Sequence, residues 1–270
     1  MSESPVFVRR RPAASRGERL ALAEGPRALA EMAALLPAAP YLSLAPLGDG
    51  HPVLVLPGLG GTDSSTAVIR HYLASRGFAA RTWGLGRNLG PTMDDLESRL
   101  AARLETVWQG GGQRKVSLVG WSLGGVYARV LAHFHPQRVR QVITLGSPIG
   151  GRPQPRRVQQ VIRRMSDGNI PPDEARRLRV LVSDPLPGVP GSAVYSRTDG
   201  IVPWQIARQV PSAIAENVEV HGSHIGLGFN ASALYLLAER LAQPEDGWRP
   251  FERSGWRRWV YGPADSTEAT

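Results

Sequence analysis

The sequence predicts an α/β fold, with a mostly parallel central sheet and helices on both faces. Between residues 52 and 148, short apolar stretches alternate with helical patterns, which indicates repeated strand–helix units. Right-handed crossovers make the strands of such units parallel. The pentapeptide Gly-Trp-Ser-Leu-Gly at residues 120–124 stands where one of these strands turns into a helix. A chain of 270 residues, 42% of them hydrophobic, is long enough to bury one large core.

The predicted elements divide the chain into three parts. Residues 1–49 form a tail and one or two helices rich in Ala and Leu, which end at the prolines of residues 37–40. Residues 50–243 form the main domain, and residues 244–270 form a basic, Trp-rich tail. Strands are expected near Val53, Ala80, Val116 and Val142 and at 192–196 and 216–220, with helices near 65–75, 93–108, 123–135 and 231–241.

Residues 149–190 interrupt the strand–helix rhythm. They are rich in Arg and Pro and contain two short helical patterns, at about 158–165 and 172–178. An insertion at this point would lie over the carboxyl edge of the sheet as a lid. The alternative is a long ordered connection without a gating role, and the sequence favours neither.

Ser122 lies at the centre of the most informative motif. Residues 114–119 before it are typical of a buried strand, and residues 123–134 after it are typical of a helix. Strand, G-x-S-x-G and helix in this order indicate a nucleophile elbow, in which the serine hydroxyl projects above the sheet edge. The flanking glycines are needed because a side chain there would collide with a neighbouring strand or helix. The alternative is a glycine-rich turn with an incidental serine.

A nucleophilic serine needs a base, which follows the serine and the acid in the chain order of this geometry. Four of the six histidines precede the serine or lie on the helix after it: His51, His71, His133 and His135. The remaining two, His221 and His224, lie in a loop between the last strand and the last helix. We predict His224 as the base because it lies deeper in this glycine-rich loop, and His221 remains the alternative.

The acid is expected between the serine and the histidine loop. Asp199 follows the strand at 192–196, at the edge where catalytic groups of open α/β sheets gather. An ordinary Asp-Gly turn with Gly200 is the alternative. Asp184 and Asp167 lie in a segment without a clear strand before them. We therefore predict Asp199 as the acid.

Two backbone N–H groups should stabilise the oxyanion of the reaction. One belongs to Leu123, the residue after the nucleophile. The second is expected from the loop Pro-Gly-Leu-Gly-Gly-Thr at 57–62, whose glycines let Leu59 turn its amide toward a substrate carbonyl. This loop matches neither G-x-G-x-x-G nor the P-loop, and no lysine follows it, which argues against nucleotide binding.

Four motifs occur in this order: Leu-Pro-Gly-Leu-Gly-Gly at 56–61, Gly-Trp-Ser-Leu-Gly-Gly at 120–125, Ser-Arg-Thr-Asp-Gly-Ile-Val-Pro-Trp at 196–204 and Ser-His-Ile-Gly-Leu at 223–227. With them, the chain resembles α/β-hydrolases of the bacterial lipase and esterase kind over about residues 50–243. The resemblance implies Ser122, Asp199 and His224 as catalytic triad, with Leu59 and Leu123 as oxyanion donors.

One position departs from that family. Many lipases have a histidine before the glycine of the oxyanion loop, and this chain has Pro57 there, so family-specific support of the loop is not expected. The calcium ligands of some lipases have no counterpart in the chain. We therefore expect no metal and no cofactor.

The expected activity is hydrolysis of carboxylic esters, with a small-molecule or lipid-like ester as substrate. Aliphatic and aromatic side chains next to the predicted site would form an apolar acyl pocket; besides the two leucines, they are Trp121, Trp204 and Ile225. Two alternatives remain: an acyltransferase that uses the same triad, and a non-catalytic binding protein of the same fold.

Composition narrows the partners and the location. The 32 basic and 23 acidic residues give a net charge of +9. Because no nucleic-acid-binding module accompanies this charge, we expect no nucleic acid among the partners. The chain has no cysteine, which excludes disulfides and thiol catalysis. The N-terminus lacks a signal-peptide pattern, because its arginines are followed by a helix with Glu24 and Glu31, and no stretch of eighteen apolar residues occurs. A cytoplasmic location is therefore expected, without an indication of the oligomeric state.

The tail at 244–270 combines tryptophan with arginine; its members are Trp248, Arg249, Arg253, Trp256, Arg257, Arg258 and Trp259. Such a tail can dock at a membrane interface. The alternative, which we favour, is a tail packed back on its own domain with Trp stacked on Arg.

Overall fold

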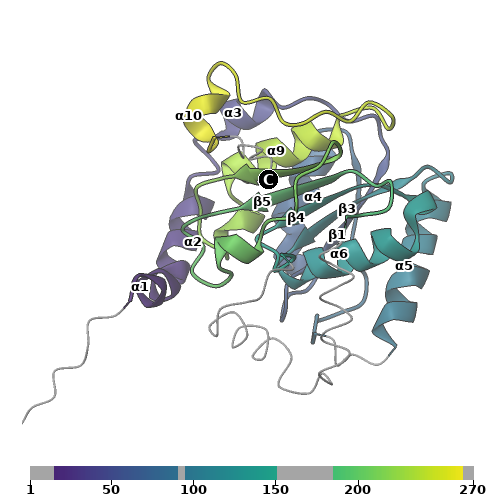
Figure 1. The fold of residues 1–270 in the computed structure, drawn as a ribbon, viewed down its shortest axis with the longest axis horizontal. Helices are drawn as coiled ribbons and strands as arrows, with labels where there is room; N and C mark the ends of the chain where they lie inside the picture. Colours follow the sequence, from purple (N-terminus) through teal and green to yellow (C-terminus); the bar gives the residue numbers. More distant parts are fainter. Residues whose placement is uncertain (1–14, 91–94, 151–184, 264–270) are drawn as a thin grey trace, which may run out of the picture.

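A computed structural model of the chain describes residues 15–90, 95–150 and 185–263. Its described part contains a six-stranded sheet in the order β2-β1-β3-β4-β5-β6, and each neighbouring pair is parallel (Figure 1). The strands are β1 (Pro52–Leu56), β2 (Ala79–Arg81), β3 (Val116–Trp121), β4 (Val139–Leu145), β5 (Gly191–Tyr195) and β6 (Ala215–Glu219). The predicted parallel α/β fold is thus confirmed, with β5 and β6 each beginning one residue earlier than expected.

Helices cover both faces of this sheet. The helices packed against it are α4 (Ala67–Ser75), α5 (Leu96–Gly110), α6 (Leu123–Phe134) and α9 (Ala231–Leu241). Alternate residues of β1 point to opposite faces, so Val53 and Val55 pack with α4 and α9, while Leu54 and Leu56 pack with α5 and α6. The result is a three-layer arrangement with the sheet in the middle. Short 3₁₀ helices lie at Asp63–Thr66, Pro136–Arg138, Trp204–Ile206 and Gly226–Gly228.

The N-terminal segment differs from the prediction. Three helices are present, α1 (Arg16–Leu22), α2 (Glu24–Ala33) and α3 (Ala39–Ser43), where one or two were expected to end at the prolines. Pro40 lies in the first turn of α3, where its missing N–H removes no helical hydrogen bond. In Figure 1, α1 and α2 (purple) lie on the side of the molecule opposite α5.

The C-terminal segment packs back on the domain, next to α9. Phe251 and Tyr261 are buried, and the Arg257 guanidinium lies 5.2 Å from the centre of the Phe251 ring. Trp256 and Trp259, by contrast, are exposed. The short helix α10 (Arg257–Val260) belongs to this segment.

Some predictions fall outside the described residues. Residues 151–184 contain both helical patterns of the suggested lid, and also Asp167 and Asp184. The lid therefore stays a prediction. Within the described ranges, no helix combines the length and the apolar character needed to cross a membrane.

Candidate active site

Ser122 occupies a sharp turn between the end of β3 and the start of α6. Its backbone has φ 53° and ψ −122°, which is a strained conformation for a residue with a side chain. Its N–H donates to the carbonyl of Leu145 at 2.8 Å, which ties the turn to β4. A Cβ on Gly120 would lie 2.3 Å from the first turn of α6, and one on Gly124 would lie 2.3 Å from the carbonyl oxygen at the end of β1. The turn therefore requires glycine on both sides of the serine, as predicted.

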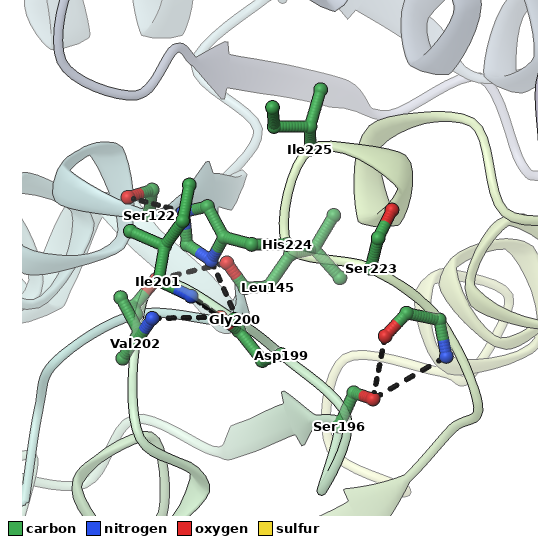
Figure 2. Close-up of polar contacts among 12 residues, drawn as sticks. Ser122, Leu145, Ser196, Asp199, Gly200, Ile201, Val202, Ser223, His224 and Ile225 are labelled. Atoms are coloured by element: carbon green, nitrogen blue, oxygen red, sulfur yellow. Dashed lines mark hydrogen bonds and ion pairs between the residues drawn. The ribbon is translucent and has the colours of Figure 1, made fainter. Parts of the chain in front are cut away.

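Three loops bring Ser122, His224 and Asp199 together (Figure 2). The Nε2 atom of His224 lies 3.0 Å from Oγ of Ser122, and its Nδ1 lies 2.7 Å from Oδ2 of Asp199. All three residues are buried. Because a carboxylate only accepts hydrogen bonds, Nδ1 carries the proton that it donates to Asp199, which leaves Nε2 as the acceptor facing Ser122.

The carboxylate of Asp199 is held by its own loop. Its second oxygen, Oδ1, accepts hydrogen bonds from the N–H groups of Ile201 at 2.8 Å and Val202 at 2.7 Å. The Asp-Gly turn considered as an alternative is therefore present, and it aims the other carboxylate oxygen at the imidazole. The hydroxyl of Ser196 donates to the carbonyl of Gly222 at 2.7 Å, which joins the aspartate loop to the histidine loop.

His221, the alternative base, is exposed on the surface of the same loop. Its backbone carbonyl accepts a hydrogen bond from the side-chain amide of Asn230 at 2.8 Å. Asn230 also caps the start of α9, where its Oδ1 accepts from the N–H of Ala233 at 3.1 Å. The described contacts of His221 thus fix the loop to the helix.

The loop of Leu59 lies against the nucleophile. A Cβ on Gly58 would lie 3.1 Å from the Cβ of Ser122. Gly60 and Gly61 use their N–H groups inside the structure, with the carbonyls of Asn88 and Gly58 as acceptors. Across the described residues, the N–H groups of Leu59 and Leu123 donate to no other protein group. Within the described part of the chain, both predicted donors are therefore without a protein acceptor.

Asn88 supports this loop, and the sequence had not pointed to it. Its side chain is fully buried, and Nδ2 donates to the carbonyl of Pro57 at 2.9 Å. Its backbone pairs with the loop on both sides, accepting from Gly60 N at 2.7 Å and donating to Gly61 O at 2.8 Å. Asn88 thus holds the loop at the position where Pro57 replaces the histidine of many lipases. No motif surrounds it, so the chain carried no signal for this role.

The residues predicted to line the pocket have different surroundings. The indole N–H of Trp121 donates to the carbonyl of His224 at 3.1 Å, so this side chain supports the histidine loop. Trp204 stacks on Tyr195, with ring centres 6.0 Å apart, and the Arg197 guanidinium lies 4.5 Å from its ring centre. Ile225, which follows His224 in the chain, is 39% exposed. In the described part of the chain, no group of three or more His, Asp or Glu side chains is arranged to hold a metal ion.

Comparison with known sequences gives two related findings. A family model described as the alpha/beta hydrolase fold matches residues 51–193. Curated proteins named triacylglycerol lipase, from Pseudarthrobacter phenanthrenivorans and Burkholderia plantarii, are each 33% identical to this chain over 110 residues. The matches cover 37% of this chain and 34% and 30% of those proteins. The chain thus aligns with about a third of the length of these curated relatives.

Solved structures share the fold. An alpha/beta hydrolase enzyme, MGS-MChE2, from a metagenome of lagoon sediments of Mar Chica, Morocco, superposes with a TM-score of 0.50 at 22% identity, covering 71% of this chain and 90% of that one. A metagenome-derived structure whose title names the lipolytic enzymes LipS and LipT gives 0.51 at 17% identity, covering 73% and 94%. At these identities the likeness concerns the fold alone. Since the family model matches more than half of the chain, this protein belongs to the alpha/beta hydrolase fold family.

Proposed function

We propose that this protein is a serine hydrolase that cleaves carboxylic esters through an acyl-enzyme on Ser122. The observation that carries the proposal is the continuous hydrogen-bonded chain from Ser122 through His224 to Asp199, with distances of 3.0 and 2.7 Å. The chain begins at a strained turn beside unpaired backbone donors, which is the arrangement that acyl transfer requires. The names of the curated relatives, both triacylglycerol lipases, favour esters as substrates.

In the first half of the reaction, Oγ of Ser122 attacks the acyl carbon while Nε2 of His224 takes the hydroxyl proton. Asp199 stabilises the imidazolium that forms. The oxyanion accepts hydrogen bonds from the N–H groups of Leu59 and Leu123. When the tetrahedral intermediate collapses, the ester C–O bond breaks and His224 gives its proton to the leaving alcohol. A water molecule then attacks the acyl-enzyme by the same steps and releases the carboxylic acid.

Exposed aliphatic side chains favour an apolar ester. Three of the loops around the site contribute one each: Leu59 from the oxyanion loop is 40% exposed, Ile201 from the aspartate loop 36%, and Ile225 from the histidine loop 39%. Each lies within two residues of a proposed donor or catalytic residue. Aliphatic groups there would contact the acyl or alcohol part of a substrate, and each buried CH₂ contributes about 0.8 kcal/mol.

Ser122→Ala tests the proposal with p-nitrophenyl esters from acetate to palmitate. Loss of the hydroxyl removes the acyl-enzyme route, so kcat should fall on the order of 10⁴- to 10⁶-fold. Circular dichroism should be unchanged, because the hydroxyl contributes nothing to the main core. A fluorophosphonate should label the wild type at Ser122 and leave the variant unlabelled. Hydrolysis by the variant within about tenfold of the wild type would contradict the nucleophile assignment.

A further inference from the structure

Helix α2 is oriented with charged side chains toward the loops of Asp199 and His224. Glu24 is only 3% exposed, whereas Leu29 on the same helix is 68% exposed. A surface helix normally buries its apolar stripe and turns its charges to water. In α2 the charged Glu24 is buried and the apolar Leu29 faces solvent. Polar contacts therefore contribute to the packing of α2 on the domain.

The carboxylate of Glu24 joins the two loops. Its Oε1 accepts hydrogen bonds from the N–H of Gly200 at 2.8 Å and from the N–H of His224 at 3.0 Å. Its Oε2 accepts from the N–H of Ile225 at 3.0 Å. One donor thus follows Asp199 directly, and another belongs to the base itself. A buried carboxylate without such donors would be strongly destabilising, so these contacts fix the loops relative to α2.

Two further side chains of α2 extend this contact. Oε1 of Glu31 accepts from the N–H of Ser223 at 2.7 Å, next to His224. The guanidinium of Arg27 donates to the carbonyl of Thr198 at 2.7 Å and to its hydroxyl at 2.9 Å, next to Asp199. Glu24, Arg27 and Glu31 are spaced by three and four residues and therefore share one face of the helix.

Glycines in both loops permit this close approach. A Cβ on Gly200 would lie 2.6 Å from the backbone of Leu20 in α1. A Cβ on Gly226 would lie 2.1 Å from Oε2 of Glu31. The acid loop and the base loop thus each carry a glycine where an N-terminal helix packs against them.

We infer that Glu24 is a positioning residue for the acid–base pair, assisted by Arg27 and Glu31. This inference rests on the proposed function. None of the three side chains makes a described contact with Ser122, so they act through the placement of Asp199 and His224. Their loss should therefore lower kcat, which depends on the geometry of the pair, and leave KM unchanged. The segment before residue 50 would then be part of the catalytic machinery.

Glu24→Gln is the decisive variant because it keeps the shape of the side chain. An amide in either orientation puts an NH₂ group against backbone N–H donors, those of Gly200 and His224 or that of Ile225. Glu216→Gln is the matched control. Glu216 is also a buried carboxylate, and it accepts from the N–H of Phe251 at 2.7 Å, but it lies near the start of β6, away from the carboxyl edge.

Four quantities are measured: kcat and KM for p-nitrophenyl butyrate per labelled active site, the melting temperature, and the low-field proton NMR signal of His224 Nδ1–H. We expect Glu24→Gln to lower kcat about ten- to a hundredfold, with KM within about twofold, and to shift or abolish the NMR signal. Glu216→Gln should lower the melting temperature and leave kcat and the NMR signal as in the wild type.

Arg27→Met provides a second test if Glu24→Gln does not fold, because the Arg27 side chain is 28% exposed and its loss is easier to tolerate. Arg27→Met should also lower kcat, by a smaller factor than Glu24→Gln. Wild-type kcat and NMR signal in the folded variants would overturn the positioning role. If the wild type shows no Ser122-dependent hydrolysis, the proposed function fails, and the NMR signal alone then decides the positioning role.

Discussion

Gly146 offers a direct way to perturb the acid–base pair from the opposite side. It follows β4 and has a φ of +55°. A Cβ at this position would lie 3.0 Å from Oδ2 of Asp199 and 3.2 Å from Nδ1 of His224, the two atoms that share the hydrogen bond. Gly146→Ala therefore introduces a methyl group against that bond, and we expect catalysis to suffer more than folding.

Gly146→Ala is expected to change both the folding stability and kcat. The left-handed backbone conformation costs a residue with a Cβ roughly 1–2 kcal/mol. The new methyl group also meets its neighbours. The nearest atom, a methyl of Leu227 at 2.7 Å, belongs to a side chain that can move aside. Asp199 and His224 then have to shift by only a few tenths of an ångström. Since a misplacement of about 1 Å can cost a factor of about 100, we expect kcat to fall about tenfold.

The assay compares Gly146→Ala with Gly112→Ala. Gly112 has a φ of +67° and open space around its Cβ position, so its replacement introduces the same backbone strain without contact to the site. Both variants should lose about 2–4 °C of melting temperature for each kcal/mol, but only Gly146→Ala should lose kcat. Wild-type kcat in Gly146→Ala, or an equal loss in Gly112→Ala, would refute the reasoning.

Three further predictions follow from single contacts. His224→Ala should lower kcat on the order of 10⁴-fold, whereas His221→Ala should stay within about twofold of the wild type in the same ester assay. Asn88→Ala leaves the buried carbonyl of the oxyanion loop without its donor, so it should cost about 1–3 kcal/mol in denaturant unfolding and also lower kcat; an unchanged kcat would separate Asn88 from the oxyanion loop. Burial lowers the pKa of His51, so the folded protein favours the neutral imidazole. The stability that neutral His51 contributes to the folded protein is fully present above the unfolded-state pKa of about 6.5 and is lost as the pH falls below it. The denaturant midpoint of the wild type should therefore drop between pH 7 and 5, and His51→Gln should remove part of that drop; equal slopes in both proteins would contradict this.

The parts of the fold that the sequence predicted are those encoded by neighbouring residues. The strand–helix rhythm and the glycines of the elbow are local patterns, and steric contact explains them directly: a Cβ on Gly120 or Gly124 has no room. The loops that carry Asp199 and His224 were recognisable because each follows a predicted strand. Once the strands are parallel and adjacent, their carboxyl ends bring these loops together.

The supporting residues could not be predicted because their contacts join distant parts of the chain. Glu24 reaches a residue 200 positions away, and Asn88 supports a loop 31 positions before it. In the sequence, Glu24 and Glu31 indicated only a helix too polar for a signal peptide. A glutamate in such a helix normally faces solvent, and nothing local distinguishes one that accepts three backbone hydrogen bonds.

A second Asp–His–Ser chain at the amino edge of the sheet shows which features distinguish the candidate site. Nδ1 of His51 lies 2.5 Å from Asp49, and its Nε2 lies 2.8 Å from Oγ of Ser117. Ser117, however, is fully buried within β3, where its backbone is part of the sheet. It has no strained turn and no adjacent helix start to supply oxyanion donors. A hydrogen-bonded Asp–His–Ser chain alone therefore does not identify a nucleophile. Ser122 differs from Ser117 by its strained turn at the carboxyl end of β3 and by the start of α6 directly after it. The protonation of His51 accordingly bears on folding.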